Sequence, residues 1–391
     1  MAKRKKSKTK TIFFGIAILL IFGIVFCLML LIGCKWYVYL CPAALAAVLV
    51  LARRTKLWHG WRVLACWIFA IVLAFSGLIF GRTDLKVSFA GTLARESIRL
   101  VMQMPALQNG GLFTVGADYA SKGSTWKTPT GYTNIKYDLS KSKLELLQNS
   151  SGSHKNVIYQ LHGGGYVIGF SDMYRNFAVR YSKLSGGADV ASLDYRIAPK
   201  NTYPAALDDA MEGWEFLLAR GYKPENIIVV GDSAGGNLTL ALTEKLRDEG
   251  KALPLALVCM SPWADLAGKG ASHTYNIYND PMFGIKKGTS ISKSFKSPAY
   301  AGNTNLQDKY LSPMYGSFKG FPPMLLQVGT YEVLESDSVT VYEKAKAAGV
   351  DVKLTKYYGM FHVFQMAGNM LPESRAAWAE VSAFIKTQFA R

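Results

Sequence analysis

Ser233 stands in a sequence that could make it a nucleophile. It belongs to the run Gly-Asp-Ser-Ala-Gly-Gly at residues 231–236, between the apolar residues 227–230 and the helix-forming residues 238–247. A sharp strand-to-helix turn holds a serine hydroxyl clear of its neighbours, and Gly231 and Gly235 leave room for that turn. The N–H groups at the start of the helix would point toward an oxyanion above the serine. The pattern predicts a nucleophile elbow, and an ordinary strand-to-helix turn is the alternative.

A glycine-rich run lies upstream of this serine. His-Gly-Gly-Gly-Tyr occupies residues 162–166, directly after the strand-like residues 157–161. Consecutive glycines let the main chain approach a substrate closely and direct N–H donors at it. A phosphate cradle is the alternative, but the run lacks the Lys-Ser/Thr of a P-loop and the spacing G-x-G-x-x-G. The run therefore favours anion stabilisation over nucleotide binding.

A serine nucleophile needs a histidine base, and the chain has five histidines. Four of them lie in unsuitable places: flanking an apolar segment, before the first core strand, in the glycine run, and in a polar insertion (His59, His154, His162 and His273). His362 remains, behind Gly359 and the strand-like residues 352–357. The carboxyl end of a strand is where open α/β sheets hold such groups, so we predict His362 as the base.

The histidine in turn needs a carboxylate to orient it. Glu332, Glu335 and Asp337 all follow the strand-like residues 324–328. Glu332 is nearest the end of that strand, from which it could reach a histidine on the next loop. Asp337 falls in the first turn of the following helix, where it could serve as a cap. We favour Glu332 as the acid and keep Asp337 as the alternative.

These motifs together resemble the hormone-sensitive-lipase-like esterases, the third family of the α/β-hydrolase fold. The resemblance runs from about residue 157 to the C-terminus. Besides the two glycine motifs, it rests on Asp-Tyr-Arg-Ile-Ala-Pro at 194–199, Tyr-Pro-Ala-Ala at 203–206, Ser-Pro-Trp-Ala-Asp-Leu at 261–266 and Leu-Ser-Pro at 311–313. Several motifs in the same order are more specific than any one of them.

The resemblance implies a role for each matching residue. Ser233 would be the nucleophile and His362 the base, and Glu332 stands where the family commonly has an aspartate. The oxyanion hole would be formed by backbone N–H groups, those of Gly163, Gly164 and Ala234. The family also has an N-terminal helical cap over the pocket, and no metal or organic cofactor is implied.

The net charge of +18 could suggest a nucleic-acid partner. Residues 1–81, however, hold 11 Lys and Arg and no Asp or Glu, so the excess charge gathers around apolar segments. We see no basic stripe with interleaved aromatic residues of the kind that follows a phosphate backbone. We therefore expect no nucleic-acid partner.

Three N-terminal segments, residues 11–32, 36–52 and 63–80, carry no charged side chain. A membrane-spanning helix needs roughly 17–25 apolar residues, so these segments predict about three transmembrane helices in contact with the lipid bilayer. Lys and Arg gather before the first segment and in the loop between the second and third segments. These two basic stretches belong on the cytoplasmic side. We expect a multi-pass cell-membrane location with the catalytic domain outside the cytoplasm. If residues 36–52 do not span, that domain faces inward.

Strand-like and helix-like runs alternate through the C-terminal part of the chain. The strands are expected at residues 157–161, 190–195, 227–230, 255–260, 324–328 and 352–357, and the helices at 204–220, 238–247, 338–348 and 373–388. This alternation predicts an α/β fold, a mostly parallel sheet with helices on both faces. We expect a membrane region at residues 1–82, a cap or linker at 83–133 and an α/β-hydrolase domain at 134–391. Residues 85–104 would form the cap helix or a juxtamembrane linker helix.

The sequence thus predicts a membrane-anchored serine carboxylesterase. Its substrates would be small or envelope-attached esters with short acyl groups, acetyl to about octanoyl, a range that the family resemblance implies. The acyl-enzyme is equally compatible with an extracytoplasmic O-deacetylase or acyltransferase acting on an envelope glycan or lipid. A non-catalytic binding protein on the same fold is a further alternative, although neither the serine nor the histidine is lost.

Overall fold

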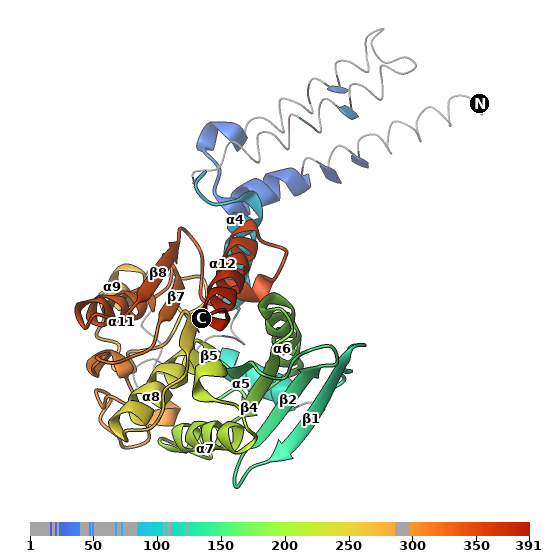
Figure 1. Ribbon diagram of the computed structural model, residues 1–391. Coiled ribbons are helices and arrows are strands. Elements are labelled where there is room, and N and C mark those ends of the chain that lie inside the picture. Colours follow the sequence, from blue (N-terminus) through green and yellow to red (C-terminus); the bar gives the residue numbers. More distant parts are fainter. Residues whose placement is uncertain are drawn as a thin grey trace. The chain divides into compact units, whose positions relative to one another are not determined.

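The structure, a computed structural model, describes residues 84–104, 107, 111–121, 123–285 and 298–391, with residues 23–39 and isolated residues between 16 and 72 (Figure 1). The chain divides into two compact units, Met1–Ser97 and Ile98–Arg391. All residues predicted to carry the chemistry belong to the second unit. The boundary falls within α4, Phe89–Met102, the helix that the sequence predicts over residues 85–104.

The described part of the first unit contradicts the predicted membrane location. Residues 23–32 are helical, Gly33 follows with a φ of 67°, and the chain then forms the short 3₁₀ helix η1, Trp36–Tyr39. Among the described residues, no helix combines the length and the apolar character that crossing a bilayer requires. Most of the predicted spans at residues 11–32, 36–52 and 63–80 lies outside the described residues. The prediction of a multi-pass cell-membrane location, with an extracytoplasmic catalytic domain, is wrong on this finding.

The second unit is built on one sheet of eight strands, in the order β1-β2-β4-β3-β5-β6-β7-β8. The first three strands in that order pair antiparallel, and all the others pair parallel. The strands are β1 Tyr132–Asp138, β2 Lys143–Asn149, β3 Val157–Leu161, β4 Asp189–Asp194, β5 Ile227–Asp232, β6 Ala256–Met260, β7 Met324–Gly329 and β8 Val352–Tyr357. The predicted mostly parallel sheet is confirmed.

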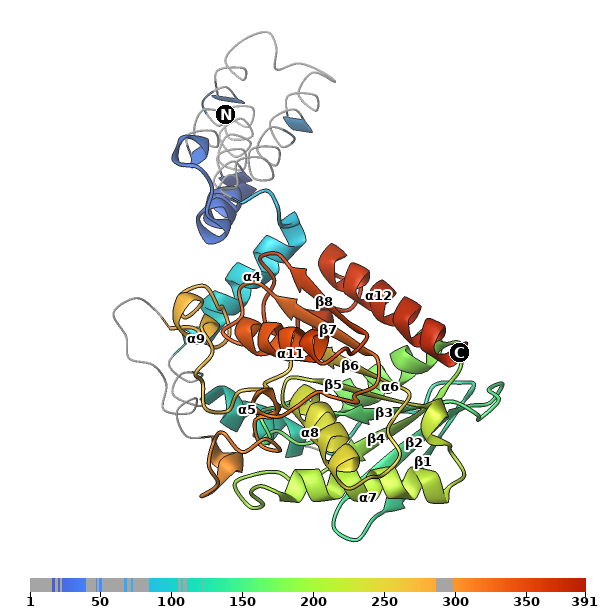
Figure 2. The same ribbon diagram turned by 60° about the vertical axis from the view of Figure 1, so that its left-hand side comes forward.

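Helices cover both faces of this sheet (Figure 2). One core cluster joins the strands to α7 Ala205–Ala219, α8 Ala234–Asp248 and α11 Glu335–Ala347. The other joins them to α6 Asp172–Ser185 and α12 Pro372–Phe389. The remaining elements are α5 Gly111–Ser121, α9 Ser272–Tyr275 and the 3₁₀ helices η3 Pro224–Asn226, η4 Ala299–Ala301, η5 Pro313–Tyr315 and η6 Phe364–Ala367.

The apolar runs form central strands because both faces of the sheet are buried. In β5, Ile227 and Val229 belong to one core cluster and Ile228 and Val230 to the other. Side chains alternate between the two faces of a strand, so a strand covered on both sides must be apolar throughout. The edge strands β1 and β8 instead alternate between exposed and half-buried residues.

The sequence does not predict β1 and β2. Their antiparallel pairing extends the sheet beyond the parallel core, and β1 is rich in polar residues. The central parallel strands, by contrast, bring their carboxyl ends to one edge of the sheet. The loops at that edge carry the predicted nucleophile, base and acid.

Candidate active site

Ser233 lies at the turn between β5 and α8, in a backbone conformation that few residues adopt. Its φ is 54° and its ψ is −120°, in the region that favours glycine. A side chain at Gly231 would collide with the backbone of Gly235, and one at Gly235 would collide with the carbonyl groups of Leu161 and His162. Glycines are therefore required on both sides of the serine, and the tight turn aims its hydroxyl at the loops beyond the sheet.

The side chains of Ser233, His362 and Glu332 form one chain of hydrogen bonds. The Ser233 hydroxyl donates to Nε2 of His362 at 2.8 Å, and Nδ1 of His362 donates to Oε2 of Glu332 at 2.9 Å. Glu332 is fully buried, and burial raises the pKa of its carboxyl while the bond to His362 opposes that rise. The arrangement fixes the imidazole tautomer that can accept a proton from the serine.

Asp337, the alternative acid, lies apart from this chain of hydrogen bonds. Its Oδ2 accepts the N–H of Asp265 at 2.8 Å, and its Oδ1 lies 3.4 Å from Nε2 of His273. Burial raises the pKa of its carboxyl to about 6, and the bond to His273 opposes the rise. Asp337 lies in the first turn of α11 and holds the Asp265 loop, whereas Glu332 alone of the two contacts His362.

The three N–H groups predicted for the oxyanion hole differ in their partners. The N–H of Gly163 donates to the phenol oxygen of Tyr174 at 2.8 Å, and that phenol donates to Oδ2 of Asp232 at 3.0 Å. The N–H groups of Gly164 and Ala234 have no hydrogen-bond acceptor within the described residues. Ala234 begins α8, where unpaired N–H groups favour negative charge. Two donors are thus available to an incoming anion.

His162 supports the glycine run as a neutral side chain. Its ring stacks on Tyr195 with centroids 4.0 Å apart, and its Nδ1 donates to the carbonyl of Gly163 at 2.7 Å. Tyr195 returns a hydrogen bond of 2.6 Å to the His162 carbonyl. Burial lowers the pKa of His162 to about 4, and the bond to Gly163 only partly offsets this.

This low pKa predicts a loss of stability in mild acid. Between pH 6.5 and about 4, the His162 side chain is protonated in the unfolded chain and neutral in the folded one, so the unfolded state binds more protons. The free energy of unfolding should fall by about 3 kcal/mol over this range on account of His162. Urea unfolding at several pH values measures the slope. His162→Asn should flatten it, and an unchanged slope would contradict the assignment.

Four contributors were missed by sequence reasoning. Tyr174 and Asp232 hold the glycine run, and Ser261 donates to Oε1 of Glu332 at 2.8 Å. The ring of Phe283 lies 4.8 Å from the imidazole of His362. Ser261 and Asp232 lie inside motifs quoted above, so a search for supporting groups could have found them. Nothing in the local pattern marks the other two.

Asp265, His273 and Asp337 form the one group of metal-ligand type found in the described chain. Their ligand atoms lie within 4.8 Å of one another. Both oxygens of Asp265 already accept N–H groups, from Ala267 at 3.0 Å and from Lys269 at 2.6 Å. The cluster is a hydrogen-bonded brace between loops, and we assign it no metal.

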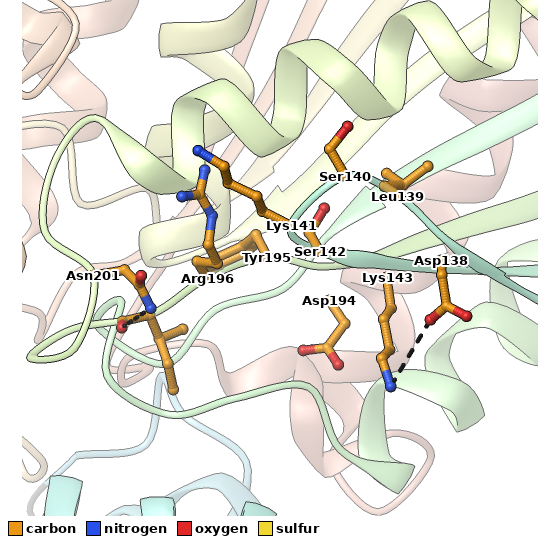
Figure 3. A pocket seen from close by; sticks show the side chains of 11 residues that line it. Asp138, Leu139, Ser140, Lys141, Ser142, Lys143, Asp194, Tyr195, Arg196 and Asn201 are labelled. Carbon is orange, nitrogen blue, oxygen red and sulfur yellow. Dashed lines mark hydrogen bonds and ion pairs between the residues drawn. The ribbon is translucent and has the colours of Figure 1, made fainter.

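A shallow pocket of about 470 Å³ lies between the β1–β2 turn and the segment that follows β4 (Figure 3). Charged side chains of both signs line it, among them Lys141, Lys143 and Asp194. The residues that line this pocket do not include Ser233, His362 or Glu332. The pocket is therefore separate from the candidate active site.

Comparisons with known proteins bear on what this geometry does. A family model described as alpha/beta hydrolase fold matches residues 158–366. An acetyl-hydrolase of Streptomyces hygroscopicus is 37% identical over 233 residues, 60% of this chain and 76% of the relative. The carboxylesterase/phospholipase LipF of Mycobacterium tuberculosis is 30% identical over 325 residues, 78% of this chain and 83% of LipF.

Solved structures agree with these relatives. An esterase from the bacterial hormone-sensitive lipase family superposes with a TM-score of 0.66 at 33% identity, over 77% of this chain and 99% of that one. The esterase EstE5, in a crystal soaked with p-nitrophenyl butyrate, gives a TM-score of 0.68 at 30% identity with the same coverage.

Proposed function

We propose that this chain, which belongs to the hormone-sensitive-lipase-like esterases of the α/β-hydrolase fold, hydrolyses short-acyl esters through an acyl-enzyme on Ser233. It is a serine hydrolase of the carboxylesterase and acetyl-hydrolase type. The observation that carries the proposal is the series of hydrogen bonds from Ser233 through His362 to Glu332.

In the first half-reaction, Oγ of Ser233 attacks the acyl carbonyl while Nε2 of His362 takes its proton. The imidazolium then gives this proton to the leaving alkoxide oxygen, which departs as the alcohol. Glu332 keeps Nδ1 protonated and stabilises the imidazolium. In the second half-reaction, His362 removes a proton from water, which attacks the acyl-enzyme, and returns that proton to Ser233. The carboxylic acid product is released.

Negative charge develops on the carbonyl oxygen in both half-reactions. We assign its stabilisation to the N–H groups of Gly164 and Ala234, which have no acceptor of their own within the described residues. The sequence also suggests Gly163, but its N–H donates to Tyr174. In our proposal Gly163 therefore serves the hole by shaping the main chain.

A helical cap over the substrate is part of the proposal, with α5 as its candidate element. A side chain at Gly116 of α5 would collide with Ile168, and a side chain at Gly164 would also collide with Ile168. Ile168 thus lies between α5 and the glycine run. A helix in this position would shield the bound ester from bulk solvent.

The preference for short acyl groups draws on the relatives. One is named an acetyl-hydrolase, another an ethyl acetate hydrolase of Pseudomonas putida, and EstE5 was soaked with a butyrate ester. An acyl preference from acetyl to about octanoyl accords with these names. The acyl acceptor is water in this proposal, so the products are a short carboxylic acid and an alcohol.

Hydrolysis of p-nitrophenyl esters from acetate to palmitate by the purified full chain tests the acyl preference. We expect kcat/KM to peak at acetate or butyrate and to fall by roughly tenfold or more by laurate, in line with the short acyl groups in the names of the relatives. A maximum at laurate or palmitate would contradict the short-acyl proposal. Rapid acyl-enzyme formation without turnover would instead indicate an acceptor other than water, as in an acyltransferase.

A further inference from the structure

We propose that Tyr174 is a positioning residue that sets the oxyanion hole by holding the N–H of Gly163. The inference rests on the proposed function, since it concerns how the N–H of Gly164 comes to face the reacting carbonyl. Within the part of the chain that the structure describes, the hydrogen bonds of the Tyr174 side chain go to Gly163 and Asp232 and not to Ser233 or His362. Tyr174 would therefore act through the main chain of the glycine run.

The Tyr174 phenol bridges two segments that must be held in register. It accepts the N–H of Gly163, in the loop after β3, at 2.8 Å. It donates to Oδ2 of Asp232, the last residue of β5, at 3.0 Å. Asp232 immediately precedes Ser233. The phenol thus fastens the glycine run to the strand that carries the nucleophile.

The phenol and both of its partners, Gly163 and Asp232, are buried, so water competes little for these hydrogen bonds. Tyr174 is 3% exposed and Asp232 is 6% exposed. The phenol fills its hydrogen-bonding capacity by donating once and accepting once. Aromatic rings also surround Tyr174, with His162 at 5.4 Å and Phe177 at 5.9 Å between centroids. These rings restrict the phenol to the orientation that reaches Gly163.

Both main-chain polar groups of Gly163 are held by hydrogen bonds, and this bears on the direction of the Gly164 N–H. Its N–H is taken by Tyr174, and its carbonyl oxygen accepts Nδ1 of His162 at 2.7 Å. In a trans peptide the N–H points away from the carbonyl oxygen of the preceding residue. With the Gly163 carbonyl turned to His162, the N–H of Gly164 is turned to the opposite side. His162 thus orients this donor directly, and Tyr174 holds the preceding peptide, from His162 to Gly163, in place beside it.

A glycine at position 163 accords with this arrangement. A side chain there would overlap the carboxylate of Asp232. The N–H of Gly163 also interacts with this carboxylate. Loss of the phenol oxygen would therefore let that N–H move toward Asp232. That shift would rotate the peptide that joins His162 to Gly163 and, through the backbone of Gly163, misdirect the Gly164 donor.

Tyr174→Phe removes the phenol oxygen and little else. We expect kcat to fall by about 10- to 100-fold, less than the 10²- to 10³-fold cost of deleting an oxyanion donor outright, with KM within about twofold of wild type. Affinity for a trifluoromethyl ketone, whose tetrahedral adduct places an oxyanion in the hole, should fall by the same factor as kcat/KM. A purely structural role would not produce this match.

Tyr222→Phe is the matched control. Tyr222 is also a buried tyrosine, and it donates to another buried aspartate, Asp189, at 2.6 Å. Asp189 begins β4, at the end of the parallel strands opposite the nucleophile. This variant should lose stability as Tyr174→Phe does and keep wild-type kcat and inhibitor affinity. Equal kcat losses in both variants would overturn the inference.

Two further results separate the possible failures. If the wild-type chain lacks serine-dependent esterase activity, the proposed function fails; if it is active and Tyr174→Phe keeps full kcat, only the positioning role fails. Should Tyr174→Phe not fold, Asp232→Asn provides the second test. It removes the charge that orients the phenol and should lower kcat and ketone affinity in parallel by roughly three- to tenfold. Wild-type values for Asp232→Asn would also overturn the inference.

Discussion

Replacing Ser233 with alanine is expected to lower kcat for ester hydrolysis on the order of 10⁶-fold, with little change in KM or in stability. Without the hydroxyl, no acyl-enzyme forms, and His362 has no proton to accept. Ser233, His362 and Glu332 would act as one unit, so removing the nucleophile should abolish nearly all of the rate enhancement that they provide together. The residual rate should be the one that the oxyanion donors and substrate binding provide alone. Serine and alanine both carry a Cβ, so the unusual backbone conformation at position 233 costs the two variants alike.

Initial rates on p-nitrophenyl acetate, mass spectrometry of the acyl-enzyme, and thermal unfolding measure this effect. Ser374→Ala is the matched control, because it deletes another buried hydroxyl, one that donates to the carbonyl of Gln365 at 3.1 Å. That control should keep wild-type kcat. Activity of Ser233→Ala near the wild-type value would remove the serine mechanism.

The second large effect is expected at the carboxylate. Glu332→Gln should lower kcat by about 10³- to 10⁴-fold, because an amide can stabilise the wrong imidazole tautomer and cannot stabilise the imidazolium. Asp337→Asn should keep kcat within about threefold of wild type and lose stability, since Asp337 holds the N–H of Asp265 and lies beside His273. The two substitutions are the same chemical change at two buried carboxylates five positions apart.

Measuring kcat over a range of pH distinguishes the two acids. The Glu332→Gln loss should persist over the pH range, because an imidazole in the wrong tautomer offers Ser233 no proton acceptor. A larger loss at Asp337 than at Glu332 would transfer the role of acid to Asp337 and contradict the proposal.

The sequence could identify the groups of the candidate site that depend on local geometry. Ser233 and the glycine run lie in short motifs whose conformation is set within a few residues. Glu332 and His362 follow neighbouring parallel strands, β7 and β8, and such strands end at one edge of a sheet. Nearness to the end of the strand also favours Glu332 over Asp337 as the acid, and that role stays a prediction for the two amide variants to test.

Contacts made by tertiary packing could not be predicted in this way. The bond between Tyr174 and Gly163 spans a loop and the start of α6, and the bond between Ser261 and Glu332 crosses 71 positions. No periodicity encodes either one. The hydropathy pattern of residues 1–80 predicted spans from composition alone, and the described residues contain no helix that meets the requirement. Apolar composition indicates that a segment tends to be buried, but it does not determine whether lipid or protein covers that segment.

The two edge strands have a consequence for the protein at high concentration. An open edge of a sheet offers unpaired N–H and carbonyl groups, onto which a strand of another copy could add. Lys136 on β1 and Lys353 and Lys356 on β8 have side chains 67%, 65% and 48% exposed, each with a carboxylate partner within its own chain. Bringing two such edges together would crowd like charges and desolvate them. These lysines therefore oppose aggregation through edge-to-edge pairing, and neutral substitutions at Lys353 and Lys356 would weaken that protection.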